Sequence, residues 1–328
     1  MLRIGLIVLA FLGATSAAAQ CRGSSFVERL SLTQLAELQA STDTIPYGRG
    51  NIWQAQKGDV NMTVLGTMHL PDPRHTPLFN HIAGALLQAD IVLVEATLDD
   101  QAAMQAYMAR NPDLMTLSND QSLPDLLDEP TWLAIREAAT ARGIPGFMAA
   151  KMQPWFLSMS LAMPPCAMSA MVSGQAGLDN MVMRAAVYNG TPIQALEPWQ
   201  NMFEFLTSGN FDEQIEALKL GLVAPDLQDE LIVSTIEYYF AGQSAKSWQM
   251  SYFLGDFAPL LDTEDFARQM AEFEQALLID RNAAWIPVIE AAASEHDTVF
   301  IAFGAAHLFG ETGVMRLLEN NGWTITPF

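Results

Sequence analysis

Positive charge is scarce in this sequence. The 328 residues include 16 Lys and Arg against 37 Asp and Glu, which gives a formal charge of −21 at pH 7. A surface with this acidic excess repels the phosphate backbone of nucleic acids. We therefore expect no nucleic-acid partner, and we attribute the charge to solubility.

Long apolar runs are missing beyond the N-terminus. After residue 19 no run reaches the roughly 18 apolar residues expected of a membrane span, and the closest, residues 157–172, is broken by two prolines. The first 19 residues differ, because Arg3 precedes the apolar stretch 4–12 and small residues follow up to Ala19. This order is typical of a signal peptide. We predict cleavage after Ala19, a periplasmic or secreted protein, and no membrane span in the mature chain.

Cysteine is nearly absent, since the chain has only Cys21 and Cys166. In the oxidising compartment to which a signal peptide leads, two cysteines predict one disulfide. The alternative is two unpaired thiols, because a bridge needs Cα atoms within about 7 Å of each other. A bridge would join the mature N-terminus to the middle of the chain.

Several common catalytic motifs are absent as well. The chain has no Gly-x-Ser-x-Gly elbow, no His-Glu-x-x-His helix, no phosphate-binding glycine loop with Lys, and no Gly-x-Gly-x-x-Gly. Each of these motifs positions a particular nucleophile, metal or phosphate. A serine hydrolase with such an elbow, a thermolysin-type enzyme and a nucleotide-binding enzyme are therefore poorly supported.

Short apolar runs predict the strands of an α/β fold. Residues 51–56 and 60–65 flank a Lys-Gly-Asp turn and predict a hairpin. The continuous branched run 91–94 is typical of a strand buried on both faces. Further strands are predicted at 192–196, 298–303 and 323–326.

The order of these runs predicts how the chain is organised. The strands come from about residues 50–98, 191–197 and 296–328, while the region from about 99 to 290 is mostly helical in pattern. We predict one domain over residues 20–328, with a central, mostly parallel sheet built from both chain ends and a large helical insertion.

A histidine or a glutamate follows four of the predicted strands. These residues are His69, Glu95, Glu197 and His307. The carboxyl ends of parallel strands line the edge where α/β sheets bind ligands, so we expect the four side chains to converge there. Each histidine stands three residues after a glycine, and we expect Gly66 and Gly304 to turn the chain sharply.

Histidine and glutamate together support two kinds of chemistry. As mixed nitrogen and oxygen ligands they suit Zn²⁺, Mn²⁺ or Co²⁺, and without a metal they suit general acid–base catalysis. The alternative is that each is a capping or hydrogen-bonded structural residue. Arg74, close after His69, is a candidate for binding a substrate carboxylate or for a salt bridge at a helix end.

Six segments resemble, in order, the conserved blocks of the TraB/GumN family. They are NIWQAQKGDVNMTVLGTMHLPDPR, DIVLVEA, GLDNMVMRAA, IQALEPWQNMFEFL, RNAAWIPVIE and TVFIAFGAAHLFGETGVMRLLENNGWTI. The resemblance extends from about residue 50 to the C-terminus. This family is similar to the Tiki metalloproteases and, more distantly, to erythromycin-esterase-like (EreA) and ChaN-like proteins.

The resemblance implies roles for particular residues. His69 and His307 match the paired histidines of the family's two Gly-x-x-His motifs, and Glu95 matches its acidic residue. In Tiki-type members these residues are the centre of a divalent-metal-dependent peptidase, which implies Mn, Co or Zn here. Arg281, which opens a helix, is a candidate for substrate binding or for a structural salt bridge. Glu197 is a second candidate for the catalytic carboxylate.

These observations lead to one hypothesis and two alternatives. The first is an exported, divalent-metal-dependent hydrolase that acts on peptide or amide bonds. The second is a haem- or metal-binding carrier on the same scaffold. The third is a metal-free, esterase-like hydrolase that uses histidine and glutamate alone.

Overall fold

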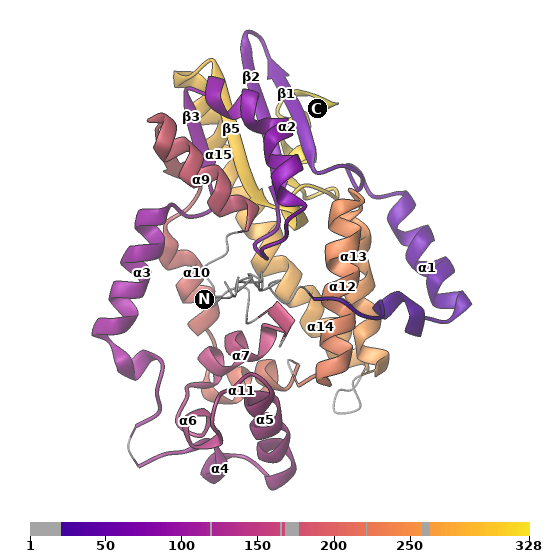
Figure 1. The fold of residues 1–328 in the computed structure, drawn as a ribbon, viewed down its shortest axis with the longest axis vertical. Coiled ribbons are helices and arrows are strands. Elements are labelled where there is room, and N and C mark those ends of the chain that lie inside the picture. Colours follow the sequence, from indigo (N-terminus) through magenta and orange to yellow (C-terminus); the bar gives the residue numbers. More distant parts are fainter. Residues whose placement is uncertain (1–20, 119, 165, 168–176, 221, 258–262) are drawn as a thin grey trace, which may run out of the picture.

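A six-stranded sheet forms one end of the molecule (Figure 1). The computed structural model describes residues 21–118, 120–164, 166–167, 177–220, 222–257 and 263–328, so the predicted signal peptide lies outside it. The strands are β1 (Ile52–Lys57), β2 (Val60–Thr67), β3 (Ile91–Val94), β4 (Ile193–Ala195), β5 (Thr298–Gly304) and β6 (Thr324–Pro327). Their order in the sheet is β4-β3-β5-β2-β1-β6.

Four neighbouring strands of this sheet are parallel. Strand β5 lies between β2 and β3, β3 also pairs with β4, and β1 runs antiparallel to both β2 and β6. In the register, Thr67 lies opposite Gly304, and Val94 lies opposite Ala302. The loops after β2, β3 and β5 therefore start at one edge, and the predicted mostly parallel sheet from both chain ends is confirmed.

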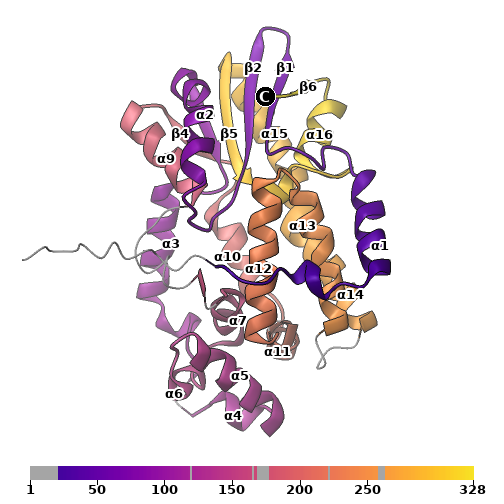
Figure 2. The ribbon, with the colours of Figure 1, turned by 45° about the vertical axis from the view of Figure 1, so that its right-hand side comes forward.

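Helices cover both faces of the sheet (Figure 2). Helices α2 (His75–Gln88) and α9 (Leu178–Asn189) pack together on one face, and α15 (Asp280–Glu295) and α16 (Val314–Asn320) pack together on the other. This cover explains why the central strands are apolar throughout, since Val92 and Phe300 have no exposed surface. Helices α9 and α15 fall within the helical range 99–290, yet they pack on the sheet.

The other α-helices that the structure describes between residues 98 and 290 lie beyond the carboxyl ends of the parallel strands (Figure 1). They are α3 (Leu98–Arg110), α4 (Leu123–Leu126), α5 (Glu129–Ala141), α6 (Gly146–Ala149), α7 (Pro154–Ala162), α10 (Trp199–Thr207), α11 (Phe211–Leu220), α12 (Pro225–Phe240), α13 (Ser244–Ser251) and α14 (Thr263–Glu274). A core of their own joins α5, α7 and α11 through Ile135, Leu157 and Leu218. None of the described helices is long and apolar enough to cross a membrane.

A disulfide joins Cys21 to Cys166, with 5.0 Å between the two Cα atoms. The predicted bridge is therefore confirmed. It links residues 21–31, here called the N-terminal strap, to a residue 145 positions further along the chain. Helix α1 (Leu32–Asp43) follows the strap.

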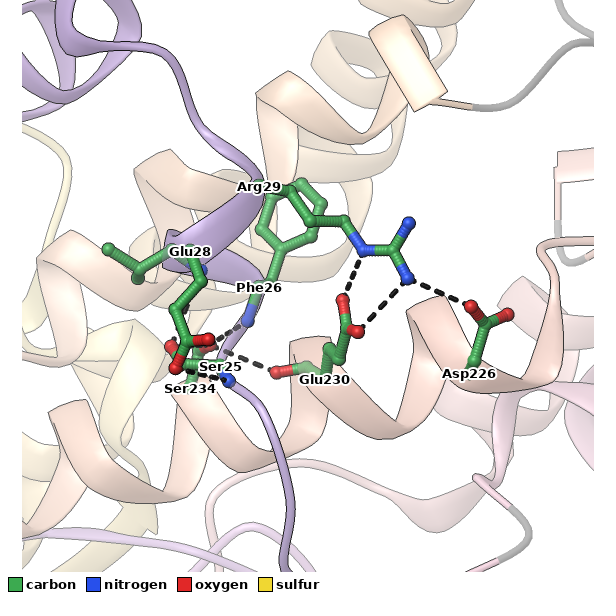
Figure 3. A network of polar contacts seen from close by, with 8 residues as sticks. Ser25, Phe26, Glu28, Arg29, Asp226, Glu230 and Ser234 are labelled. Carbon is green, nitrogen blue, oxygen red and sulfur yellow. Dashed lines mark hydrogen bonds and ion pairs between the residues drawn. The ribbon is translucent and has the colours of Figure 1, made fainter.

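The N-terminal strap is bonded to α12 (Figure 3). The Ser25 hydroxyl is 2.7 Å from the Ser234 hydroxyl, and the Phe26 N–H donates to that same Ser234 oxygen at 2.8 Å. Arg29 forms ion pairs with Asp226 and Glu230 on the same helix. The strap therefore holds α12 in place by a buried contact as well as by surface charge.

Candidate functional site

A cavity of about 590 Å³ opens at the carboxyl ends of β2, β3 and β5. Its wall includes the residues that follow these strands, one face each of α12 and α13, and the segment that leads into α15. Helix α12 is tied to the sheet because the Tyr239 hydroxyl donates to the Gly66 carbonyl at 2.9 Å. His69, Glu95, Arg281 and His307 all line this cavity.

Close packing, rather than an unusual backbone conformation, explains the glycines before the two histidines. Neither Gly66 nor Gly304 has a positive φ, so the expected sharp turn through forbidden backbone space is not what they provide. A Cβ on Gly66 would lie 2.9 Å from the Ala305 Cα and 2.5 Å from the Leu308 Cδ1. Gly66 therefore lets β2 lie against the short helix η5 (Ala305–His307), which carries His307.

The ring of His69 lines the cavity, and its Nδ1 is paired with the Asp179 carboxylate. Its side chain is 67% exposed, and its Nδ1 lies 3.2 Å from the Asp179 Oδ1. The Asp179 carboxylate raises the pKa of His69 to about 9. Asp179 is in the first turn of α9. The start of this helix can pack against the His69 backbone because Gly177 has no Cβ, which would lie 2.2 Å from the His69 carbonyl oxygen. His69 is therefore a charged imidazolium at neutral pH.

His307 has the opposite environment. Its ring is almost fully buried and lies 4.4 Å, between centroids, from the ring of Trp285. Burial lowers the pKa of His307 to about 4. The Asn282 amide donates to the Thr312 carbonyl, so its Oδ1, 2.6 Å from the His307 Nδ1, accepts the ring proton. The Nε2 of His307 therefore carries a lone pair at neutral pH.

Glu95 is held by two donors. Its Oε1 accepts the Gly304 N–H at 2.6 Å, and its Oε2 accepts from Arg281 at 2.7 Å. Burial alone would raise the pKa of Glu95. In the acid range where Glu95 titrates, His307 is also protonated, and the positive charges of His307, His69 and Arg281, together with the Gly304 N–H, lower this pKa to about 2. Glu95 is therefore ionised at any ordinary pH.

Arg281 lies at the centre of the charged cluster. Its Nε donates to Glu197 at 2.7 Å, and its Nη1 lies 3.2 Å from the Nε2 of His307. Its guanidinium carbon lies 4.8 Å from the centre of the Trp285 ring. Arg281 follows a π-helical turn, Gln275–Ile279, and such turns are frequent at functional sites.

The structure brings five of the predicted site residues together and leaves one apart. Glu95, Glu197, Arg281 and His307 contact one another directly, and His69 lies beside them, with its Nε2 3.9 Å from the point that a Cβ of Gly304 would occupy. These five residues are here called the charged cluster. Arg74 is bonded instead to Asp72 and Glu237, with its guanidinium 4.2 Å from the centre of the Phe240 ring, and it does not line the cavity. Asp179 and Asn282 orient the two histidines, although the sequence pattern gave no role to either.

The arrangement of donors around Arg281 bears directly on the predicted metal. The part of the chain that the structure describes contains no group of three His, Cys, Asp or Glu side chains placed to hold a metal ion. The Oε2 of Glu95 and the lone pair of His307 both face the guanidinium, not a common empty point. In this arrangement the residues do not fit a metal ion. The binding of Mn, Co or Zn by His69, Glu95 and His307 therefore stays a prediction.

The fold and this cluster agree with the comparison to known families. The model of the TraB/PrgY/gumN family matches residues 51–327. The chain therefore belongs to this family, and the matched region contains the sheet and all five residues of the cluster. A search of curated proteins finds no match.

Proposed function

We propose that the protein is a hydrolase and that the cavity at the carboxyl ends of β2, β3 and β5 is its active site. The convergence of side chains around Gly304 carries this proposal. The point that a Cβ of Gly304 would occupy is 3.3 Å from the Glu95 Oε1, 3.9 Å from the His69 Nε2 and 3.8 Å from the His307 Cδ2. A carboxylate and an imidazole thus reach one place at the end of a cavity, as proton transfer to and from a substrate requires.

The two groups divide the proton transfers between them. Glu95 is ionised and accepts a proton from the water that attacks the scissile carbonyl carbon. His69 is protonated and donates a proton from Nε2 to the leaving oxygen or nitrogen as the bond to carbon breaks. At neutral pH Glu95 is ionised and His69 is protonated, so each group starts the reaction in the protonation state that its role requires.

The other members of the cluster act as positioning residues. Arg281 fixes the Glu95 carboxylate, and His307 fixes Arg281 through its neutral Nε2. Asp179 holds His69 through Nδ1, so that Nε2 is the atom left for the substrate. The two Gly-x-x-His motifs therefore have unequal roles in this proposal, one chemical and one supporting.

The predicted metal-dependent peptidase is a variant of this proposal with a clear structural requirement. Arg281 would have to release both Glu95 and the Nε2 of His307 before the three predicted ligands could share an ion.

The disulfide supports a location outside the cytoplasm, because such bridges persist in oxidising compartments. We therefore keep, as part of the proposal, that the signal peptide is cleaved and that the protein is exported.

Hydrolysis measured with and without chelation tests the proposal. We expect purified protein to cleave activated esters or amides after exhaustive treatment with EDTA. His69→Gln and Glu95→Gln should each lower kcat by about 10²–10⁴, whereas His81→Gln, at an exposed site on α2, should not change it. Activity that disappears with EDTA and returns with Mn²⁺, Co²⁺ or Zn²⁺ would establish the metal-dependent variant instead.

Two results would contradict the proposal as a whole. One is the absence of hydrolysis of esters, amides and peptides by the wild-type protein with and without added metal. The other is a haem absorption band in the purified protein, which would favour the predicted carrier function.

A further inference from the structure

The cavity wall changes character away from the charged cluster. Among the described lining residues, the acidic, basic and imidazole side chains are those of Glu95, Arg281, His69 and His307. Much of the remaining wall is apolar and includes Met202 on α10, Leu231 on α12, Trp248 on α13 and Phe273 on α14. A cavity with one polar end and an apolar body binds a ligand of the same polarity pattern.

The serines on this wall provide space rather than polar contacts. Ser247 and Ser251 face the cavity from α13, and their hydroxyls already bond to Thr235 at 3.1 Å and to the Trp248 carbonyl at 2.6 Å. A hydroxyl that already has a hydrogen-bond partner within the protein can be covered by an apolar ligand at little cost in free energy. The small side chains of α13 therefore leave room for the apolar part of a ligand.

Arg281 has no donor left for an anionic ligand. Its Nε and Nη2 atoms bond to Glu197 and Glu95, and its Nη1 bonds to the Leu277 carbonyl and contacts His307. Arg281 is paired with the carboxylates of Glu95 and Glu197, and the other cation at this end, His69, is paired with Asp179. Three carboxylates thus face two cations, so a further negative charge at this end of the cavity would meet net repulsion. The reacting end of the ligand is therefore uncharged.

We propose that the substrate is an uncharged ester or amide with a large apolar acyl group, which lies along the wall formed by α10, α12, α13 and α14. The ester or amide bond rests on the proposed hydrolase function, while the apolar and uncharged character rests on the cavity alone. A volume of about 590 Å³ accommodates a drug-sized ligand. The flexible side chains of Met202 and Met270 adapt the wall to its shape.

Binding of an uncharged fluorescent probe, N-phenyl-1-naphthylamine, tests the ligand class without requiring turnover. We expect saturable binding to the full chain and displacement by methyl decanoate. At about pH 8, where a carboxylic acid is ionised, decanoate should compete at least about tenfold less well, the equivalent of about 1.4 kcal/mol. Equal competition by the acid and its ester would overturn the claim of an uncharged reacting end.

Two serines in similar helical settings provide a matched pair of variants. Ser251→Phe fills the cavity, and Ser294→Phe places the same ring on the exposed side of α15, where the Ser294 hydroxyl also bonds to the carbonyl three residues earlier. We expect at least about a tenfold loss of probe affinity in the first variant and none in the second. Equal affinity in both folded variants would place the probe elsewhere and overturn the proposal.

Acyl-length preference provides the second measurement. With p-nitrophenyl esters from acetate to dodecanoate, Met270→Ala should move the optimum of kcat/KM to longer acyl groups, because it enlarges the apolar wall. Ser251→Phe should move the optimum to shorter groups. Unchanged optima would contradict the assigned wall. Probe binding as expected without any ester hydrolysis would contradict the hydrolase function and leave the ligand class supported.

Discussion

The Nη2 of Arg281 lies 2.7 Å from the Oε2 of Glu95, although 186 positions separate the two residues in the chain. The same Nη2 lies 2.6 Å from the Oε1 of Glu197. The three side chains are 11%, 20% and 7% exposed, so this is a largely buried charge cluster. Arg281 thereby joins the ends of β3 and β4 to α15.

Replacing Arg281 by Ala should strongly destabilise the fold. The change leaves Glu95 and Glu197 buried without a counter-charge, and breaking a buried ion pair costs about 3–5 kcal/mol. Urea unfolding followed by circular dichroism measures this loss. Arg49→Ala breaks an exposed pair with Asp43 and should cost at most about 1 kcal/mol. Similar losses in the two variants would contradict the buried cluster.

His307 should make the fold less stable in weak acid. Its folded-state pKa is about 4, below its ordinary value of 6.5, so the unfolded chain binds more protons between these values. Stability therefore falls as the pH drops from about 6.5 to about 4, by at most about 3 kcal/mol from this group. Unfolding curves at several pH values should show a smaller fall in His307→Gln than in the wild type. A variant as acid-sensitive as wild type would contradict a neutral, buried His307.

Asp179→Asn should lower the pKa of His69 from about 9 toward 6.5, because it removes the carboxylate charge 3.2 Å from the Nδ1 of His69. Proton NMR titration of the ring measures this change directly. If His69 is the proton donor, the alkaline limb of the rate profile should move down in pH by the same amount. An unchanged NMR titration would show that Asp179 is not the partner of His69.

The sequence predicted that the site's side chains meet at one edge of the sheet, but it did not predict which of them bond to one another. His69, Glu95, Glu197 and His307 each follow an apolar run, and parallel strands bring such positions to one edge. The central place of Arg281 depends on the π-helical turn before it and on how far a long side chain reaches, and a linear pattern records neither. Asp179 has the appearance of an ordinary acidic residue in a first helical turn.

The disulfide should stabilise the protein independently of the charged cluster. Cys21→Ser combined with Cys166→Ser frees the N-terminal strap at one end and should cost about 2–4 kcal/mol. The bonds of Ser25 and Phe26 to Ser234 remain, so the strap should stay on α12. Thermal unfolding of the double variant and of reduced wild type should agree. Equal stability with and without the bridge would contradict this role.

Gly66 should tolerate no side chain, and Gly84 provides the comparison. A Cβ on Gly66 would lie 2.9 Å from the Ala305 Cα, and that backbone atom cannot move without η5, which carries His307. At Gly84, within α2, a Cβ would meet nothing within 4 Å. Gly66→Ala should therefore cost about 1–3 kcal/mol, whereas Gly84→Ala should stabilise the helix by about 0.5–1 kcal/mol. Urea unfolding distinguishes a loss of stability in Gly66→Ala from a gain in Gly84→Ala. The NMR resonances of the His307 ring should shift only in Gly66→Ala. A neutral Gly66→Ala would show that the loop after β5 has room to adjust, so that close packing against β2 is not what positions His307.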